Sequence, residues 1–342
     1  MSPLVNQLVD RALHQPAYDF KRRQGKRIRG SMVQIGFEMA GGSGRVSETI
    51  AESIECLHAG SLVIDDVQDD SQCRRGEPTL HQVIGVPLAI NAGNWMYFRA
   101  LELLTTAPLP GNQRTWLVEA MVTAGRRCHE GQALDLHARV DQLPASYWHE
   151  TAHAISTLKT GVLVELAVAM GCIAAGANNV LQSAMTTFGC QIGVALQMRN
   201  DLEELQSIAR GQIDGEGCDC IRDDDLRHAR VTWPWAWAFE LTGEERCHSL
   251  IRRLKTATRE RQSVAADVLS ITQSHGDQII AGHIREQVRL LGEHVVDRRL
   301  LEQMRECLQP IEQPREPGVG AGVQALAAPE CAGVQALAAK GR

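Results

Sequence analysis

The sequence of 342 residues lacks several features that would assign its class at once. The net charge of −6 at pH 7 leaves no basic excess, which argues against a general nucleic-acid-binding protein. None of the ten cysteines belongs to a CxxC pair, and Cys218 with Cys220 forms only a lone CxC, a weak metal signal. We therefore expect mostly reduced cytosolic thiols and no disulfide framework.

Signals for export or membrane insertion are also missing. The first residues, "MSPLVNQLVDRALHQ", contain no apolar core of the kind found in secretory signals. The longest apolar stretch, residues 162–177, is interrupted by Glu165 and is too short for a membrane span. We expect a cytoplasmic protein without a transmembrane segment.

Alternating runs of β-branched residues are scarce, whereas the helix formers Ala, Leu, Glu, Arg and Gln dominate. Helices are predicted over residues 4–14, 27–40, 47–70, 79–83, 87–106, 113–138, 146–173, 178–207, 226–241, 245–255, 259–273 and 277–309. The pattern predicts an all-α fold with one domain of long antiparallel helices over residues 1–310.

The boundaries of these helices carry their own signals. Gly41 is expected to end the second helix in a left-handed conformation. Ser47 and Thr49 offer N-cap oxygens for the third helix, and Glu52 suits a capping box with Thr49. Residues 208–225 are rich in Gly and Asp and predict a long polar loop, a common form of functional lid. Residues 311–342 repeat AGVQALAA and are expected to form a separate tail.

An acidic cluster follows the apolar run "LVI" in "LVIDDVQDD". Asp65, Asp66 and Asp69 have i, i+1, i+4 spacing, so a helix would let the three carboxylates converge on one spot. Such like charges repel, and Mg²⁺, which favours carboxylate oxygens and phosphate, would offset the repulsion. Taken alone, the pattern also fits a solvated acidic helix end.

A second set of oxygen ligands repeats the spacing in "QMRNDLEEL". Asn200, Asp201 and Glu204 follow an apolar helical face, so the two sets could face each other and hold metal between them. Asn200 offers a carbonyl oxygen without a charge, which predicts a weaker second site.

Basic and polar residues recur in separate clusters. They are Lys26 and Arg29 in "GKRIRG", His58, Arg74 and Arg75, and Lys159 and Thr160 in "TLKTG". Lys159 could instead extend to the surface, and His58 could be an ordinary core or surface histidine. Acidic metal sites beside separated basic clusters predict a ligand with more than one diphosphate, and the apolar helix faces predict a hydrophobic remainder.

These motifs closely resemble the trans-isoprenyl diphosphate synthases of the polyprenyl synthetase family. "GKRIRG" is similar to that family's GKRLRP segment, and "ECLHAGSLVIDDVQDDSQCRRGEPTLH" resembles its first aspartate-rich region. "EGQALDL", "LKTG", "FGCQIGVALQMRND" and "DLRHARVTWP" follow in the family's order. The resemblance covers about residues 25–240.

The resemblance implies an isoprenoid synthase fold, with long helices around a central active-site cavity, usually in a homodimer. It implies condensation of isopentenyl diphosphate with an allylic diphosphate, with up to three Mg²⁺ ions in each active site. Metal binding is implied for Asp65, Asp66, Asp69, Asn200, Asp201 and Glu204. Contacts with the allylic diphosphate are implied for Arg74, Lys159, Thr160 and Gln197, and contacts with isopentenyl diphosphate for Lys26, Arg29, His58 and Arg75. Asp65, Asp66, Asp69, Lys159 and Asp201 would be the catalytic set.

The sequence departs from the family at three points. Asn200 stands where the second motif usually has aspartate, Gln212 or Cys220 where the following loop has lysine, and Arg230 where a later diphosphate-binding lysine is usual. Reduced activity, a modified mode of substrate binding or a changed reaction would each account for these differences.

Product length is expected to depend on the depth of the cavity below the aspartates. Gly60 and Ser61 are small and should not form a floor there, so C20 geranylgeranyl diphosphate is the expected product, with C15 and C25 as alternatives. Deeper residues could also close the cavity, namely Leu57, Trp95, Met96, Tyr97 and Phe98. The last four could instead serve ordinary helix packing or a dimer interface.

Three other functions remain open. A terpene cyclase would ionise an allylic diphosphate without isopentenyl diphosphate, and a related enzyme would transfer the prenyl group to another acceptor. A non-catalytic subunit of a heteromeric synthase would fit the altered second motif. The retained Lys26, Arg29, His58 and Arg75 favour elongation, and the intact first motif disfavours a non-catalytic subunit.

Overall fold

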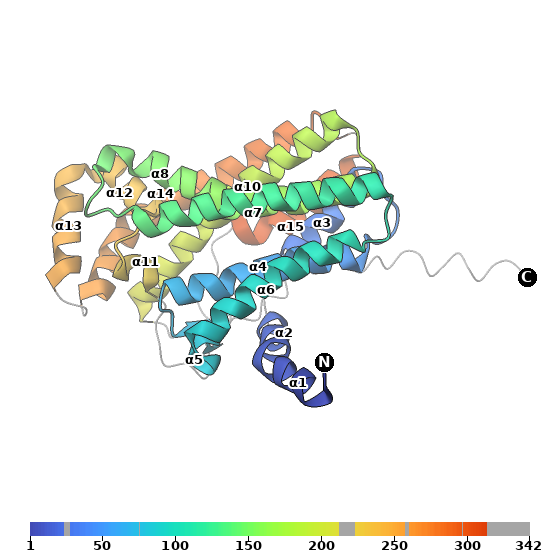
Figure 1. Ribbon diagram of the computed structural model, residues 1–342. Helices are drawn as coiled ribbons and strands as arrows, with labels where there is room; N and C mark the ends of the chain where they lie inside the picture. Colours follow the sequence, from blue (N-terminus) through green and yellow to red (C-terminus); the bar gives the residue numbers. More distant parts are fainter. Residues whose placement is uncertain (24–27, 75, 212–222, 257–259, 296, 313–342) are drawn as a thin grey trace, which may run out of the picture.

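The computed structural model describes residues 1–23, 28–74, 76–211, 223–256, 260–295 and 297–312 (Figure 1). Lys26, Arg75, Gln212, Cys220 and the repeated tail lie outside the described residues. What the sequence predicts for them is therefore not addressed by the structure.

The described part of the chain is helical almost throughout, and this confirms the prediction of a single all-α domain. The helices are α1 Pro3–Val9, α2 Gln15–Arg22, α3 Ile28–Met39, α4 Glu48–Gln68, α5 Leu80–Ile84, α6 Val86–Thr105, α7 Gly111–His137, α8 Trp148–Ile155, α9 Val162–Ala175, α10 Asn179–Arg210, α11 Asp224–Arg227, α12 Trp233–Thr242, α13 Glu244–Thr256, α14 Glu260–Leu291 and α15 Arg298–Glu312. Shorter elements join them: the π-helical turns η1 Asp10–His14 and η3 Ser156–Gly161, the 3-10 turn η2 Ala145–Tyr147, and a small antiparallel hairpin of β1 Cys73–Arg74 and β2 Glu77–Pro78.

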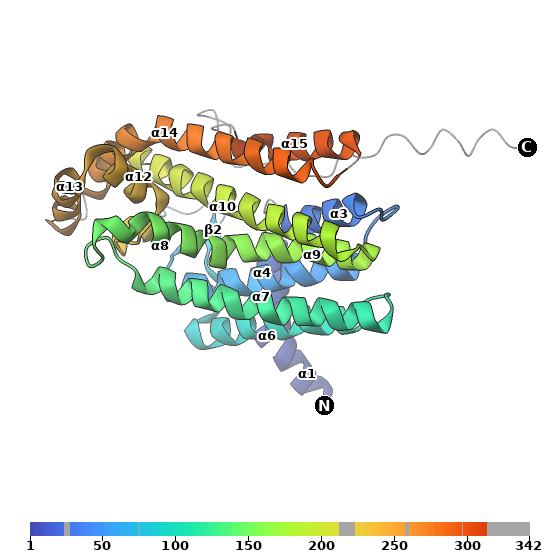
Figure 2. The same cartoon turned by 90° about the horizontal axis from the view of Figure 1, so that it is seen from above.

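The long helices run side by side, with α14 and α15 along one side of the molecule and α6 along the other (Figure 2). Helix α9 lies in the middle, packed against α3, α7 and α10. Every residue from Val162 to Ile173 except Glu165 is buried, which explains why this helix is apolar on all its faces.

The stretch Ala145–Ala175 is long and apolar enough to cross a membrane by length and composition. Yet 72% of its most apolar window is buried inside the protein, as is usual for the core helix of a soluble protein. The expectations of no transmembrane segment and of a cytoplasmic location therefore remain predictions.

Helices α4 and α6 approach each other closely at Gly60 and Gly93. A Cβ atom added at Gly60 would lie 2.8 Å from the Gly93 carbonyl oxygen and 3.0 Å from Met96 Cβ, so no larger side chain fits without movement. The sequence predicts a deep cavity because Gly60 is small. Close packing of the two helices is a separate reason for a glycine at this position.

Several helix ends differ from those expected. The predicted helix 226–241 is two helices, α11 and α12, separated by Ala229, which has a positive φ of 54°. The break expected at 274–276 is absent because α14 continues through Gly276, whose lack of a side chain leaves room for the Trp237 ring. Gly41 has the expected positive φ.

The starts and ends of two further helices also differ. Helix α4 begins at Glu48 with Ser47 as its N-cap residue, so the capping box predicted at Thr49 is wrong. Helix α10 extends to Arg210 before Gly211 ends it in a left-handed conformation, so the predicted loop at 208–225 begins later than expected.

The cysteines follow the prediction only in part. Cys56, Cys128, Cys172, Cys190, Cys247 and Cys307 are free. Cys73 is disulfide-bonded and is the exception, among the cysteines that the structure describes, to the prediction of mostly reduced thiols. It directly precedes Arg74 in β1.

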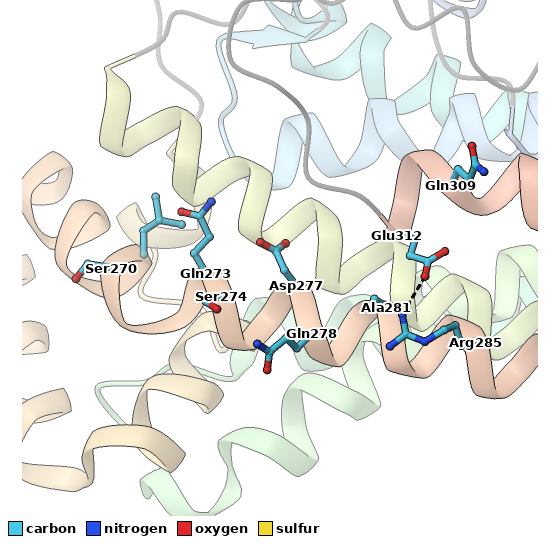
Figure 3. A pocket seen from close by; sticks show the side chains of 10 residues that line it. Ser270, Gln273, Ser274, Asp277, Gln278, Ala281, Arg285, Gln309 and Glu312 are labelled. Carbon is cyan, nitrogen blue, oxygen red and sulfur yellow. Dashed lines mark hydrogen bonds and ion pairs between the residues drawn. The ribbon is translucent and has the colours of Figure 1, made fainter.

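A groove of about 780 Å³ lies along α14, beside the end of α15 (Figure 3). Arg285 and Glu312 form an ion pair across it, with 3.2 Å between Nη1 and Oε1. The buried Arg199 of α10 donates hydrogen bonds to Asp277 in the groove and to the carbonyl oxygen of Ile311. The residues that line the groove are mainly polar, and none belongs to the predicted site.

Candidate active site

The first acidic region, Asp65, Asp66 and Asp69, lies at the C-terminal end of α4. All three residues are buried, with exposed fractions of 8%, 0% and 2%. Buried carboxylates need compensating partners. The hairpin after α4 supplies one by bringing Arg74 back over the helix end, where Nε lies 2.5 Å from Asp66 Oδ1 and Nη2 lies 3.2 Å from Asp65 Oδ2.

Lys159 supplies a second cation from η3. Its Nζ lies 3.0 Å from Asp65 Oδ1 and 2.6 Å from Asp135 Oδ2. Burial would lower the pKa of Lys159, but the charges of Asp65 and Asp135 raise it above its ordinary value, so the ammonium stays charged. The π-helical turn, a geometry found often at functional sites, replaces the regular helix expected here.

Arg230 is the third cation of this region. It pairs with Asp69, and its Nη1 lies 3.2 Å from Asp135 Oδ2. The strained Ala229 turns the chain just before Arg230, and an antiparallel bridge between Arg139 and Arg230 holds the segment beside the end of α7. Arg227 also donates a hydrogen bond to the Asp69 carbonyl oxygen.

Asp135 is a member of this network that the sequence does not single out. It lies near the end of α7, is 7% exposed and links Lys159 to Arg230. On the same helix, Gln132 donates a hydrogen bond of 3.0 Å to Asp65. Both residues belong to the "EGQALDL" motif, but a single carboxylate in a helix gives no spacing pattern that would identify its partners.

The second acidic region, Asn200, Asp201 and Glu204, lies on α10 and has a different character. Asp201 is buried, whereas Asn200 is exposed and Glu204 is half-buried. Asp201 accepts hydrogen bonds from the neutral groups Gln197 Nε2, at 2.7 Å, and the Trp233 backbone nitrogen, at 3.0 Å. Burial and the nearby charge of Asp225 raise the pKa of Asp201 to about 8, although both hydrogen bonds act in the opposite direction.

The predicted convergence of three carboxylates on one spot is not found. Among residues with described positions, no three His, Cys, Asp or Glu side chains are grouped closely enough to hold a metal ion. Arg74, Lys159 and Arg230 instead lie between the carboxylates. The donor set still fits a hard divalent cation, because it consists of carboxylate oxygens and its present partners are long side chains that can turn away.

The remaining predicted residues lie in two places. Thr160 donates a hydrogen bond of 2.6 Å to Gln197 Oε1, which joins η3 to α10. Arg29 and His58 lie on neighbouring helices, where the Gly30 nitrogen donates to Glu55, one turn before His58.

The residues considered for the cavity floor point in different directions. Trp95 packs against His14 and Tyr18, Met96 belongs to the core, and Phe98 is 72% exposed. Tyr97 lies edge-on to His129 with 5.8 Å between the ring centroids, and its ring edge would lie 3.1 Å from a Cβ at Gly60. Of the four neighbours, Met96 and Tyr97 are therefore the two placed against α4 below the aspartates, and Tyr97 is the one that brings an aromatic ring there.

The geometry defines an all-α protein in which acidic and basic side chains from α4, α7, η3 and the segment before α12 meet. The family model for polyprenyl synthetase matches residues 10–271. The chain is 29% identical to a geranylgeranyl diphosphate synthase from Sulfolobus acidocaldarius over 264 residues, covering 75% of this chain and 76% of the relative. It is 30% identical to a geranylfarnesyl diphosphate synthase from Aeropyrum pernix over 234 residues, covering 66% and 70%.

A solved structure gives the same fold. The geranylgeranyl pyrophosphate synthase from Corynebacterium glutamicum, complexed with isoprenyl diphosphate and magnesium, superposes with a TM-score of 0.73 at 20% identity, over 90% of this chain and 91% of that one. The fold is therefore that of the isoprenoid synthases. The chain belongs to the polyprenyl synthetase family and is a prenyltransferase enzyme.

Proposed function

We propose that this enzyme elongates an allylic diphosphate with isopentenyl diphosphate and that its main product is C20 geranylgeranyl diphosphate. The observation that carries the proposal is the buried network in which Arg74, Lys159 and Arg230 alternate with four carboxylates, those of Asp65, Asp66, Asp69 and Asp135. Such a network can bind a diphosphate and divalent cations together, because each incoming charge finds an opposite charge already in place.

Metal binding is assigned to two sets of residues across the site. They are Asp65, Asp66 and Asp69 of the first acidic region, and Asn200, Asp201 and Glu204 of the second. Mg²⁺ held there would neutralise the negative charge that develops on the leaving diphosphate. Up to three ions would fit the charge of the substrate, and their number is part of the proposal.

The cations of the network then take a second role. When a diphosphate enters, Arg74, Lys159 and Arg230 can turn from the carboxylates to its oxygens, and Thr160 and Gln197 offer polar groups beside them. The charged side chains stabilise the departing diphosphate, while the apolar helices exclude water from the allylic cation. The proton lost after addition can leave on the diphosphate itself, so no separate protein base is required.

Isopentenyl diphosphate is assigned to the junction of α3 and α4. Arg29 and His58 lie there on neighbouring helices, and Lys26 and Arg75 are added from the sequence pattern. Replacing Arg29 with alanine should weaken incorporation of isopentenyl diphosphate and leave binding of the allylic substrate nearly unchanged. Unchanged incorporation would contradict the assignment of Arg29 to isopentenyl diphosphate.

Tyr97 is assigned as a residue that limits the growth of the prenyl chain. It lies against α4 five residues before Asp65, and burial, followed by the neighbouring Cys128 and Asp65, raises the pKa of Tyr97. A prenyl chain that grows past the first acidic region would meet Tyr97 and His129 after more than one helical turn, about 7 Å. The C20 length itself is supported by the similarity to a geranylgeranyl diphosphate synthase, and the similarity to a geranylfarnesyl diphosphate synthase keeps C25 as the alternative.

We also propose a homodimer through α6 and α7. These adjoining helices expose large apolar side chains, with Phe98 at 72%, Val122 at 55% and Trp116 at 51%. Exposed apolar surface of this kind usually marks an interface. The change Phe98→Asp should shift the protein towards monomers in analytical ultracentrifugation.

A product assay tests the main proposal. The purified protein is incubated with Mg²⁺, labelled isopentenyl diphosphate and, in separate reactions, dimethylallyl, geranyl, farnesyl or geranylgeranyl diphosphate. We expect a linear C20 alcohol after dephosphorylation. A cyclic hydrocarbon without isopentenyl incorporation would show a cyclase, and no product from any substrate would favour a non-catalytic subunit or another acceptor.

The same assay tests product length. The change Tyr97→Ala should lengthen the product by one or more C5 units, because it removes the side chain that would stop the growing chain. Trp95→Ala is the matched control, since this aromatic ring of the same helix packs against His14 and Tyr18 instead of α4. Equal product lengths in the wild type and in Tyr97→Ala would contradict the assignment of Tyr97.

A further inference from the structure

Five buried or half-buried residues form a closed ring of hydrogen bonds between η3, α10 and the start of α12. The Trp233 indole nitrogen donates to Ser156 Oγ at 2.8 Å, and the Trp233 backbone nitrogen donates to Asp201 Oδ2 at 3.0 Å. Gln197 Nε2 donates to the other Asp201 oxygen at 2.7 Å, and Thr160 Oγ1 donates to Gln197 Oε1 at 2.6 Å. Ser156 and Thr160 belong to the same π-helical turn, which closes the ring.

Trp233 is the only residue of this ring that donates hydrogen bonds to two other elements, from its backbone nitrogen to α10 and from its indole nitrogen to η3. Trp233 is 2% exposed, and neighbouring aromatic side chains fix its indole group. The ring centroid of Trp237 lies 5.7 Å from that of Trp233, and the centroid of His149 lies 5.2 Å from it. A side chain held in this way has little rotational freedom to lose, so its hydrogen bonds define position well.

The two partners of Trp233 belong to different parts of the candidate site. Asp201 is the buried aspartate of the second acidic region. Ser156 begins the turn that carries Lys159, whose ammonium contacts Asp65 of the first acidic region. Trp233 therefore lies on one of two hydrogen-bonded connections from Asp201 to the turn that carries Lys159, and the other runs through Gln197 and Thr160.

We propose that Trp233 is a positioning residue that sets the placement of Asp201 relative to Lys159 and Thr160. Its backbone nitrogen fixes the carboxylate of Asp201, and its indole nitrogen fixes the first residue of η3. The inference rests on the proposed roles of Asp201, Lys159 and Thr160 in binding the metal–diphosphate group.

The test compares Trp233→Phe with a matched control, Trp235→Phe. Both changes shorten a buried tryptophan of the same helix, and Trp235 is 1% exposed and packs against Trp148. Only Trp233→Phe removes a donor of the ring. Ser156→Ala removes the acceptor of the same hydrogen bond with a much smaller loss of volume, and the double variant completes the cycle.

Two measurements separate a positioning role from simple stability. The first is hydrogen exchange of the ligand-free protein, in which Trp233→Phe and Ser156→Ala should speed exchange of the amides in 156–161, whereas Trp235→Phe should not. The second is calorimetric binding of inorganic pyrophosphate with Mg²⁺, which should weaken about 3- to 10-fold in each of the first two variants, the range expected for one hydrogen bond. The double variant should bind no worse than either single variant.

The possible results are distinct. Wild-type affinity in Trp233→Phe and Ser156→Ala would overturn the inference, and so would an equal loss in Trp235→Phe. A wild-type protein that neither binds pyrophosphate nor turns over substrate would instead refute the proposed function, which keeps the two failures apart.

Discussion

The two acidic regions hold their aspartates by opposite means. Asp65, Asp66 and Asp69 are paired with Arg74, Lys159 and Arg230, whereas Asp201 is held by a side-chain amide and a backbone nitrogen. The first region thus carries its own counter-charges, and the second holds a buried carboxyl whose pKa is raised to about 8. We therefore expect a bound ligand to replace the cations as partners of the aspartates in the first region. In the second region, a bound ligand adds a charge beside a carboxyl that neutral groups hold.

The largest effect should come from the first region. Replacing Asp66 with asparagine keeps the shape but removes the charge that Arg74 contacts at 2.5 Å. We expect turnover to fall by at least about 100-fold, because charge stabilisation of the leaving group is lost. Steady-state kinetics with saturating Mg²⁺ measures the loss.

Asp70→Asn is the matched control for this change. Asp70 is adjacent to the region but has a side chain that is 76% exposed, and asparagine tolerates its positive φ of 51°. Near-normal turnover in Asp66→Asn would mean that the charged pairs of the first region are not needed for turnover. The functional difference between the two regions would then be lost.

A smaller effect is expected at Asp135, which connects two cations of the first region. The change Asp135→Asn should lower kcat/KM by about tenfold and the free energy of unfolding by ~1–3 kcal/mol, because Lys159 and Arg230 lose a charged acceptor. Asp141→Asn is the control, since the Asp141 side chain is 8% exposed, close to the 9% of Asp135, and pairs with Arg139 and Lys255 instead. Equal losses of activity in both variants would mean that Asp135 contributes only to stability.

The second region offers the reverse test, in which charge is added. Asn200 is exposed, and the change Asn200→Asp should keep turnover or raise it by up to about fivefold, the range of an exposed charge interaction. The Mg²⁺ concentration at half-maximal activity should fall at the same time. A large loss would show that the amide has a role of its own and that the second region does not lack charge.

The smallest effect concerns the turn before Arg230. Ala229 has a positive φ, which costs an L-residue about 1–2 kcal/mol, partly offset by the greater freedom of glycine in the unfolded chain. Ala229→Gly should therefore raise the free energy of unfolding by about 0.5 kcal/mol, visible as a small rise in Tm, with unchanged activity. Ala238→Gly, within α12, should lower it. A lower Tm in Ala229→Gly would mean that the turn is not strained.

The sequence predicts the helices well because their apolar periodicity is a local property. Periodicity does not show which long-range contacts a small residue serves, so Gly276 is misread as a break although it packs against Trp237. The two-helix arrangement at 224–242 was also missed, since the strained Ala229 carries no glycine or proline signal.

For the candidate site, spacing identifies groups that share one helix, such as Asp65, Asp66 and Asp69. It does not identify groups that meet across the fold. Asp135 and the Trp233 ring are examples, since their partners lie 24 and 77 residues away. The ion pairs within the first region were unpredictable for the same reason.

The charges of the first region nearly balance, and this affects the stability of the enzyme when no substrate is bound. Its four carboxylates, Asp135 included, face three cations, so the ligand-free site carries about one net negative charge. Many active sites are strained or self-repelling when empty, and their proteins lose stability for the sake of catalysis. Here the side chains that bind the substrate also neutralise the site when the substrate is absent. The arrangement needed for catalysis therefore does not reduce the stability of the folded protein.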